Sequence, residues 1–443
     1  MPNEPEPSIV RIMAPSGGPI SDIWSDAREV AAAVFASARP ERLLLGWCCL
    51  VLALIVGSLW DVTSPTNMPA LGATEPGESL TVLFREYVEE FERPNAWDTA
   101  DVDGREVQRA FASAPEDVRQ QVERLRRRGA FESLLGGMSA GLDEVRLGVV
   151  GLQPARIIRG LDIAILSNIE SLWRNDRGFL VIFGTVFLLL FSIFGGAITR
   201  IDAERFSRDR DVPALAVVRW ALRDWRRLFG GVFLPPVLAL LLLLPATASG
   251  LIAYIPGLDV LVSLLWILVL VFSFAAALVI VAWLVALPML SAGTACESGD
   301  PTELVVRCAG LIRHRPGRYV LLLATAVVAG AVGWLLVSGV TVITLEAARA
   351  AGSQFGGPFA EIQGTAWPSL DAVNSVQTAN ESSNTRGLAT SILDGWRWLV
   401  TTMCMGWTIA FIAGAGGRIY LLQRRSVERL QIDELGAPGP ADG

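Results

Sequence analysis

The sequence predicts an all-α polytopic membrane protein, a bundle of six transmembrane helices in three hairpins. Only 18% of the 443 residues are charged and 52% are hydrophobic, whereas ordinary soluble domains carry about 25% charged residues. Several charge-free runs exceed the roughly 20 apolar residues that cross a bilayer as a helix. Because hydrocarbon offers no hydrogen bonds, each run must satisfy its own backbone and is expected to be helical. The arginine distribution described below indicates how these helices are oriented.

The clearest pair of runs lies within residues 229–295, and we expect the rest of the chain to be organised around it. Val232–Tyr254 and Val260–Ala295 carry no charged residue. The Pro256-Gly257 pair between them is a turn signal, which predicts a helical hairpin. The second run is longer than a bilayer requires, so we expect it to tilt or project, with a kink or end at Pro288.

The chain before this hairpin begins with a polar tail. Residues 1–19 are rich in Pro, Gly, Ser and Glu, and this composition predicts disorder. Residues 20–60 hold an amphipathic interface helix and then the first span, Leu43–Trp60. Because Arg39 and Arg42 precede that span, we interpret it as a retained signal anchor, with cleavage after it as the alternative.

Residues 61–177 form a long polar insert, which we expect to be an external helical domain. Its best helical pattern runs from Pro154 to Trp173, where proline suits a first turn. Its last helix is expected to lead directly into the second span. The pattern's apolar stripe consists of Ile158, Leu161, Ile165, Ile169 and Leu172.

The remaining spans and loops follow from the same criteria. We expect a core over 178–345 that holds the second to fifth spans and two arginine-rich cytoplasmic segments. An external polar loop, the sixth span and a cytoplasmic tail then complete the chain. The ranges are 200–227 and 295–318 for the two basic segments, 346–394 for the loop, 395–417 for the sixth span and 418–443 for the tail.

Arginine predicts the orientation of the six spans. All 37 basic residues are arginine, and 20 of them lie in the N-terminal segment, the two basic segments and the tail. Basic residues near span ends favour the cytoplasmic side. We therefore expect both termini in the cytoplasm of a bacterium, with the protein in the cell inner membrane. Four tryptophans then fall at the outer interface as an aromatic belt, namely Trp60, Trp173, Trp396 and Trp398.

The chain also repeats an order of elements: an amphipathic helix, basic residues, an outward span and a return span. In the second repeat the amphipathic helix follows Asp211, and in the third it follows Asp300, both interpreted as acidic caps. Around residue 219, apolar and basic residues fall on opposite faces, which predicts a helix at the lipid head groups. The residues proposed to contact anionic lipid are Arg219, Arg223, Arg226 and Arg227.

No residue pattern predicts a catalytic, cofactor or metal site. The spans lack charged residues in their interiors, whereas transporters and pumps often retain them there. Their serines and threonines are expected to bond to their own helices or to join neighbours. The single histidine, His314, would need Cys308 beside it to form a metal site, but Arg313 and Arg315 flank it. We therefore expect a solvated basic segment there.

Several short stretches resemble a family of uncharacterised six-span integral membrane proteins from planctomycete-type bacteria. They are the Gly195-Gly196-Ala197 segment through Ile201, the Ile255-Pro256-Gly257 turn, Pro288, Arg315-Pro316, and Ile419-Tyr420-Leu421-Leu422 through Leu435. The resemblance implies the six-span architecture and carries no reaction or ligand. The layout also resembles, more distantly, membrane domains attached to some glycerophosphodiester phosphodiesterases, whose catalytic domain is absent from this sequence.

Two functions from different classes fit these observations. The first is a non-enzymatic scaffold or envelope factor that contacts anionic lipid head groups and a membrane-protein partner or a second copy, with no nucleic acid. The alternative is a transporter or channel for a lipid or an apolar small molecule. A membrane enzyme is least favoured, because no general acid or base lies near the bilayer. A continuous polar groove would favour transport, and a tightly packed bundle would favour the scaffold.

Overall fold

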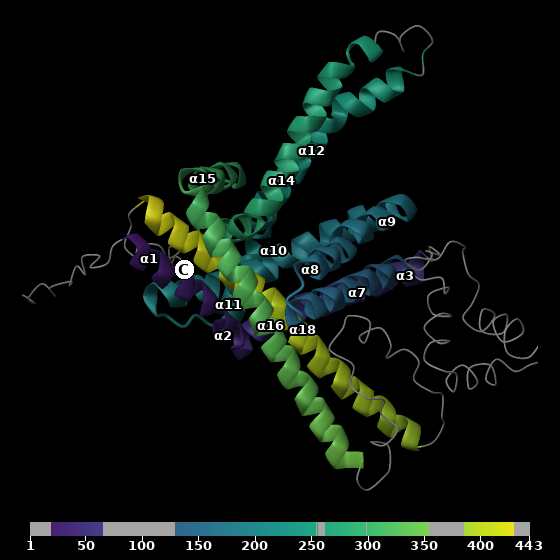
Figure 1. Cartoon of the computed structure of the whole chain (residues 1–443), viewed down its shortest axis with the longest axis vertical. Helices are drawn as coiled ribbons and strands as arrows, with labels where there is room; N and C mark the ends of the chain where they lie inside the picture. Colours follow the sequence, from purple (N-terminus) through teal and green to yellow (C-terminus); the bar gives the residue numbers. More distant parts are fainter. Residues whose placement is uncertain are drawn as a thin grey trace, which may run out of the picture. The chain divides into compact units, whose positions relative to one another are not determined.

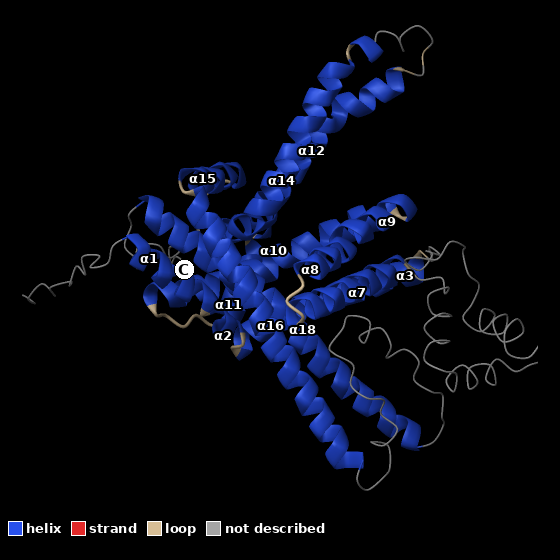
Figure 2. Cartoon of the chain, viewed as in Figure 1, coloured by secondary structure: helices blue, strands red, loops and turns tan. Residues whose placement is uncertain are grey.

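The computed structural model describes residues 19–64, 129–253, 255, 262–297, 299–353 and 385–428, and these residues are helical apart from short connections (Figures 1 and 2). The helices are α1 (Pro19–Ala31), α2 (Ala33–Ser37), α3 (Pro40–Thr63), α7 (Ala130–Val150), α8 (Pro154–Leu161), the π-helix η2 (Asp162–Ser167), α9 (Asn168–Asn175), α10 (Arg177–Arg208), α11 (Ala214–Arg223), α12 (Trp225–Ile252), α14 (Trp266–Cys296), α15 (Pro301–His314), α16 (Pro316–Ser353) and α18 (Thr385–Glu428).

Several predictions concern residues outside these ranges. They are the disordered tail, the first half of the external insert, the Pro256-Gly257 turn, most of the 346–394 loop and the end of the C-terminal tail.

The prediction of six membrane-spanning helices is confirmed. Among the described residues, six helices are long and apolar enough to cross a bilayer: α3, α10, α12, α14, α16 and α18. Three of them continue as helix beyond the bounds that the sequence predicts. The first basic segment was expected to begin at residue 200, the external loop at 346 and the tail at 418, but α10 continues to Arg208, α16 to Ser353 and α18 to Glu428. Charged residues do not end these helices, because an α-helix satisfies its backbone equally well in water and in lipid.

The chain divides into two compact units, which we describe separately. Unit 1 comprises residues 1–46, 191–336 and 406–443, and unit 2 comprises 47–190 and 337–405.

Within each unit, contacts pair the spans as three antiparallel hairpins. In unit 2 the rings of Trp60 on α3 and Phe179 on α10 lie 5.9 Å apart, and Ser338 on α16 contacts Cys404 on α18 at 3.6 Å. In unit 1, α12 and α14 lie side by side along their lengths (Figure 1). The Trp283 indole donates to the carbonyl of Val232 at 2.9 Å.

In unit 2, α7 and the α8–η2–α9 segment form a closely packed hairpin on the predicted insert. Glycines permit the approach: a Cβ on Gly141 would lie 2.5 Å from the Gly160 carbonyl oxygen, and one on Gly137 2.6 Å from Asn168. The buried Asn168 amide donates to the Leu134 carbonyl at 2.8 Å. The helix predicted over 154–173 is therefore present, with a π-helical stretch inside it.

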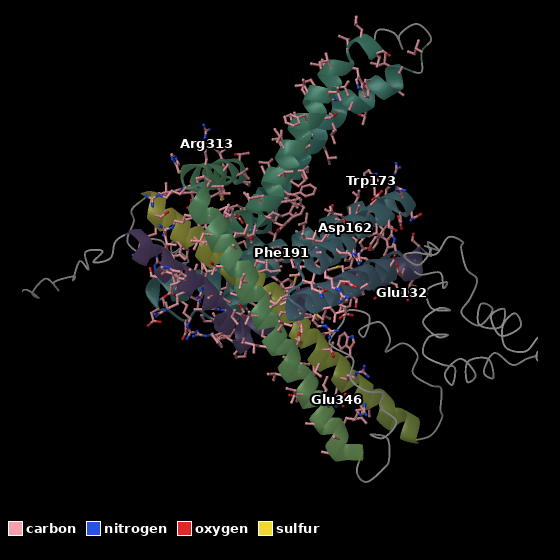
Figure 3. The ribbon with its side chains drawn as sticks, in the orientation of Figure 1. Glu132, Asp162, Trp173, Phe191, Arg313 and Glu346 are labelled. Atoms are coloured by element: carbon pink, nitrogen blue, oxygen red, sulfur yellow. The ribbon has the colours of Figure 1, made fainter. Side chains whose placement is uncertain are left out.

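The predicted apolar stripe of this helix is oriented differently from our expectation. Only Leu172 is buried, whereas Ile158, Leu161, Ile165 and Ile169 are exposed. The face that packs against α7 is instead the one that carries Gly160 and Asn168, because small residues there allow the helices to meet. Figure 3 shows Asp162 between α8 and α9 and Trp173 near the end of α9.

Two carboxylates tie this hairpin to the spans of unit 2. Asp61, at the end of α3, accepts the backbone N–H groups of Phe131 and Glu132 at 2.9 and 3.0 Å and so caps the N-terminus of α7. Asp176 accepts the Phe179 N–H at 2.9 Å at the start of α10 and the Trp60 indole N–H at 3.2 Å. The bonds from the backbone N–H groups of Phe131, Glu132 and Phe179 satisfy donors that a helix start leaves open.

In unit 1, the second half of α18 is the central element, and the α12–α14 hairpin is not. A Cβ on Gly46 of α3 would lie 2.2 Å from the Gly406 carbonyl oxygen, and one on Gly416 2.7 Å from that of Pro288. The Thr199 hydroxyl of α10 donates to the Ala413 carbonyl at 3.0 Å. By contrast, only 11% of the most apolar part of α14 is buried, against 72% for α18. A strongly apolar helix is stable when it faces lipid, so its hydropathy does not identify the centre.

Several local predictions are corrected by the structure. Pro288 lies inside α14, which continues to Cys296, so it does not end the helix; the alternative, a kink at Pro288, stays a prediction. Asp300 is the N-cap residue of α15, but its side chain makes no capping hydrogen bond. The N-cap residue of α11 is Pro213, and Asp211 instead pairs with Arg205 at 2.7 Å.

Four of the intramembrane hydroxyls behave as predicted, whereas the Thr408 hydroxyl is buried and makes no hydrogen bond within the described residues. Thr247, Ser249 and Thr325 donate to carbonyl groups of their own helices at 2.7–2.9 Å. Thr402 does the same at 2.9 Å, and its oxygen also accepts the Trp47 indole N–H at 3.0 Å within unit 2.

Candidate functional site

The charged side chains of unit 1 gather where the spans end, on the helical extensions of α10 and α18. All of α12 and α14 lies in this unit, and each of the other four spans contributes one end: the first residues of α3 and α16 and the last residues of α10 and α18. Starts and ends alternate along the chain, as three hairpins that begin on one side require. Two separate ion-pair clusters join these ends.

The first cluster consists of Arg42, Asp202 and Arg418, and we call it the triad. The two nitrogens Nε and Nη2 of Arg418 donate to the two carboxylate oxygens of Asp202 at 2.8 and 3.1 Å. Nη1 of Arg42 lies 2.5 Å from Asp202 Oδ1. Arg418 also donates to the backbone carbonyl of Glu29 at 2.7 Å. The exposed fractions are 1% for Arg42, 1% for Asp202 and 8% for Arg418, so two guanidinium groups share one buried carboxylate.

The second cluster consists of Glu297, Arg307, Arg424 and Glu428, and we call it the quartet. Arg307 pairs with Glu297 and with Glu428, both at 2.6 Å. Arg424 pairs with the same two carboxylates at 3.2 and 2.8 Å. Tyr420 also donates its hydroxyl to Glu297. Two cations therefore face two anions, and the quartet is electrically balanced.

The quartet raises the pKa of Arg307 on α15. Partial burial alone would lower the pKa of this guanidinium, but the hydrogen bonds that it donates to Glu428 and the charge of Glu297 outweigh that effect. The favourable pairing therefore exceeds the cost of desolvation at this position.

Other contacts extend the charged layer. Arg318, at the start of α16, donates to the buried Asp26 of α1. The guanidinium of Arg200 lies over the Trp220 ring at 4.0 Å, and that of Arg227 lies 5.6 Å from the same ring. These cation–π contacts hold α11 against the end of α10.

A cavity of about 470 Å³ opens beside the triad. Five arginines line it: Arg39, Arg42, Arg205, Arg418 and Arg425. Four acidic residues line it as well: Asp26, Glu29, Asp202 and Asp209. Its volume falls in the range of about 300–1,000 Å³ that small-molecule pockets occupy.

The four predicted membrane-surface arginines lie along α11 and the start of α12. Arg219, Arg223 and Arg226 are exposed, and Arg227 is partly buried beside Asp224 at 3.5 Å. The predicted apolar face is exposed at Leu215, Leu222 and Trp225. The helix buries a third face, formed by Val217 and Ala221. None of these four arginines lines the cavity, so the structure separates them from the triad.

The predicted environment of His314 and Cys308 can also be compared with the structure. His314 is exposed in the last turn of α15, and Cys308 is buried, with its sulfur 3.7 Å from the Met289 carbonyl oxygen. Burial, with a contribution from the charge of Glu297, raises the pKa of the Cys308 thiol to about 12. Within the described ranges, no group of three or more His, Cys, Asp or Glu residues is placed to hold a metal ion.

Comparison with known proteins identifies no family: no family model, no curated protein and no solved structure matches the chain. The six-span architecture is supported by the helices themselves. Membership of the bacterial family that the sequence resembles stays a prediction.

The triad and the quartet were not predicted from the sequence. We assigned 200–227 and 418–443 to cytoplasmic segments, and we predicted no ion pairs between them. One signal was present: Ile419, Tyr420, Leu421 and Leu422 continue the apolar pattern beyond Gly417. All four are buried in the structure, which is why α18 continues and brings Arg418 and Arg424 to their partners.

Proposed function

We propose that this chain is a non-enzymatic scaffold or envelope factor of the bacterial inner membrane, with both termini and the charged layer in the cytoplasm. The observation that supports it best is that the two ion-pair clusters connect the ends of different spans. Asp202 joins α10 to α3 and α18, and the quartet joins α14, α15 and α18. Such a layer holds the spans in one arrangement, as a docking platform requires.

The basic face of α11 supports a contact with anionic lipid. Arg219, Arg223 and Arg226 are exposed next to the exposed apolar residues Leu215 and Leu222. An amphipathic helix of this type lies at the head-group boundary and attracts anionic lipid. The arginine bias toward these segments supports a cytoplasmic orientation.

Transport of a lipid or an apolar small molecule is the second candidate. It would require polar groups free to contact a substrate along the spans. The hydroxyls of Thr247, Ser249 and Thr325 bond to their own helices instead, which favours the scaffold.

Photo-crosslinking in native membranes tests the scaffold. A photoreactive phenylalanine analogue at the exposed position Arg313, whose side chain points away from α15 (Figure 3), should form one discrete protein adduct. The matched control is Leu311 of the same helix, which is buried and should form none. Purified protein in proteoliposomes should show no lipid scrambling. Scrambling activity without a discrete adduct at Arg313 would overturn the proposal in favour of transport.

A further inference from the structure

We infer that the cavity beside the triad binds a phosphate group, carried by a phospholipid head group or by a soluble phosphate ester. The inference goes beyond the scaffold role and does not depend on it. It rests on a local excess of buried positive charge that opens into a cavity.

The charge excess is visible in the pairing. Within the triad, Arg42 and Arg418 share one carboxylate, that of Asp202. Arg39, three residues before Arg42, also lines the cavity, and no ion pair to it is present among the described residues. An isolated buried cation is strongly unfavourable unless an anion compensates it.

The guanidinium atoms also have unused hydrogen-bonding capacity. Within the described part of the chain, Nε of Arg42 and Nη1 of Arg39 are buried and make no hydrogen bond, whereas Nη1 of Arg42 is paired with Asp202. Arg42 is 1% exposed, so its guanidinium is shielded from bulk solvent. Buried donors without an acceptor are uncommon in native proteins. A bound anion would supply the acceptors.

The other charged groups that line the cavity do not remove this excess. Arg318 neutralises Asp26, and Asp211 neutralises Arg205. Glu29 is half-buried and Asp209 is exposed, as is Arg425. Charges at the exposed rim are screened by solvent and salt more strongly than the triad. The buried floor of the cavity is therefore positive.

The geometry favours a phosphate over smaller anions. Arginine presents a planar fork that matches phosphate oxygens, so two or three arginines around one cavity can each form paired hydrogen bonds to it. The cavity of about 470 Å³ is also far larger than a halide needs. It lies where α3 begins its span, so a lipid head group as well as a soluble ester can be considered.

The test compares the full-length protein, purified in detergent, with Arg39→Gln and with the control Arg313→Gln. Arg313 is exposed on α15 and does not line the cavity. Both changes remove one positive charge, and among the described residues no ion pair of Arg39 would be lost. Binding is measured by native mass spectrometry for phosphatidylglycerol and, in a second arm, by calorimetry for glycerol 3-phosphate.

We expect saturable binding in at least one arm. Arg39→Gln should weaken it at least tenfold, and Arg313→Gln less than twofold. Binding in the first arm alone identifies a lipid head group, and binding in the second identifies a soluble phosphate as sufficient. Arg42→Gln should weaken binding further, provided that its circular dichroism is unchanged. Absence of binding in both arms, or equal loss in Arg39→Gln and Arg313→Gln, would overturn the inference.

Discussion

The triad and the quartet join span ends in the same unit, yet they differ in charge balance and burial. The quartet places two arginines against two glutamates, and Arg307 is 36% exposed. The triad places two arginines against Asp202, and all three side chains are at most 10% exposed. In the quartet each positive charge has a negative counterpart, so a structural role accounts for it. In the triad one positive charge and some hydrogen-bond donors are left without a partner. This difference distinguishes a structural ion-pair network from a candidate anion site.

The largest effect is expected from Asp202→Asn. This change removes the only carboxylate of the triad and leaves Arg42 and Arg418 buried without a counter-charge. Breaking a buried ion pair from one side costs about 3–5 kcal/mol, so the free energy of unfolding in detergent should fall by that order. Denaturation followed by circular dichroism measures it. Asp209→Asn, at an exposed position, is the control and should change stability by less than about 0.5 kcal/mol.

The same position allows a direct test of the charge excess. In the double variant Arg42→Gln/Asp202→Asn, one buried cation is lost together with the anion. The double variant should therefore be more stable than the sum of the two single changes predicts. Strict additivity would show that Arg42 and Asp202 do not interact.

A smaller loss is expected from Glu297→Gln in the quartet. Glu428 still faces both arginines, and Arg307 is partly solvated, so the neighbouring charges are not left alone. Losing the charged hydrogen bonds should cost about 1.5–3 kcal/mol, again measured by denaturation. Glu303→Gln, exposed on the same helix as Arg307, serves as the control. A loss as large as that of Asp202→Asn would contradict the distinction between the clusters.

The Cys308 thiol, next to Arg307 of the quartet, can be used to measure how well solvent is excluded there. Burial raises the pKa of its thiol from 9.0 to about 12. Below pH 9 the thiol is protonated in both the folded and the unfolded state, so it should not change the free energy of unfolding. Above pH 9 the thiol ionises in the unfolded state only, so the free energy of unfolding should fall by about 1.4 kcal/mol per pH unit. Mass-spectrometric mapping should show little maleimide labelling of Cys308 at pH 8 in the folded protein. Full labelling after denaturation is the control, and rapid labelling of the folded protein would refute burial.

The smallest effect on stability is expected on the basic face of α11. Arg219→Gln and Arg223→Gln remove exposed charges, so the free energy of unfolding should change by less than about 0.5 kcal/mol. If α11 lies on anionic lipid, each change should weaken binding of the purified protein to phosphatidylglycerol-rich bicelles by about 1 kcal/mol at low salt. Leu251→Gln, on a span outside this face, should leave the salt dependence unchanged. If bicelle binding by the arginine variants depends on salt as in the unmodified protein, α11 is not a lipid-binding site.

The α14 and α18 helices show which part of the fold can be predicted from sequence. Both were recognised as spans because their apolar runs are long enough to cross a bilayer. The more apolar helix, α14, was expected to be the organising element, but only 11% of its apolar part is buried. The less apolar α18 is 72% buried. Hydropathy measures how well a helix tolerates lipid, so it favours the peripheral helices over the central one.

The candidate site was predictable in part. Arg39 and Arg42 were recognised as basic residues before the first span, but they were interpreted only as signals for its orientation. Arg42 meets Asp202 across 160 positions of sequence and Arg418 meets it across 216. No local period or spacing predicts such a pairing, because it depends on which helix extensions lie next to each other.

The sequence by itself determined the class of this protein. It established an all-helical membrane protein with six spans, since charge-free runs of that length are stable as helices in lipid. It also placed most arginines at alternate span ends. Only the tertiary structure decided which helix lies at the centre and which arginines are neutralised. Segments far apart in the sequence pack closely at Gly46 and Gly416 and form ion pairs at Asp202. These contacts form only when the chain folds, so no local sequence pattern encodes them.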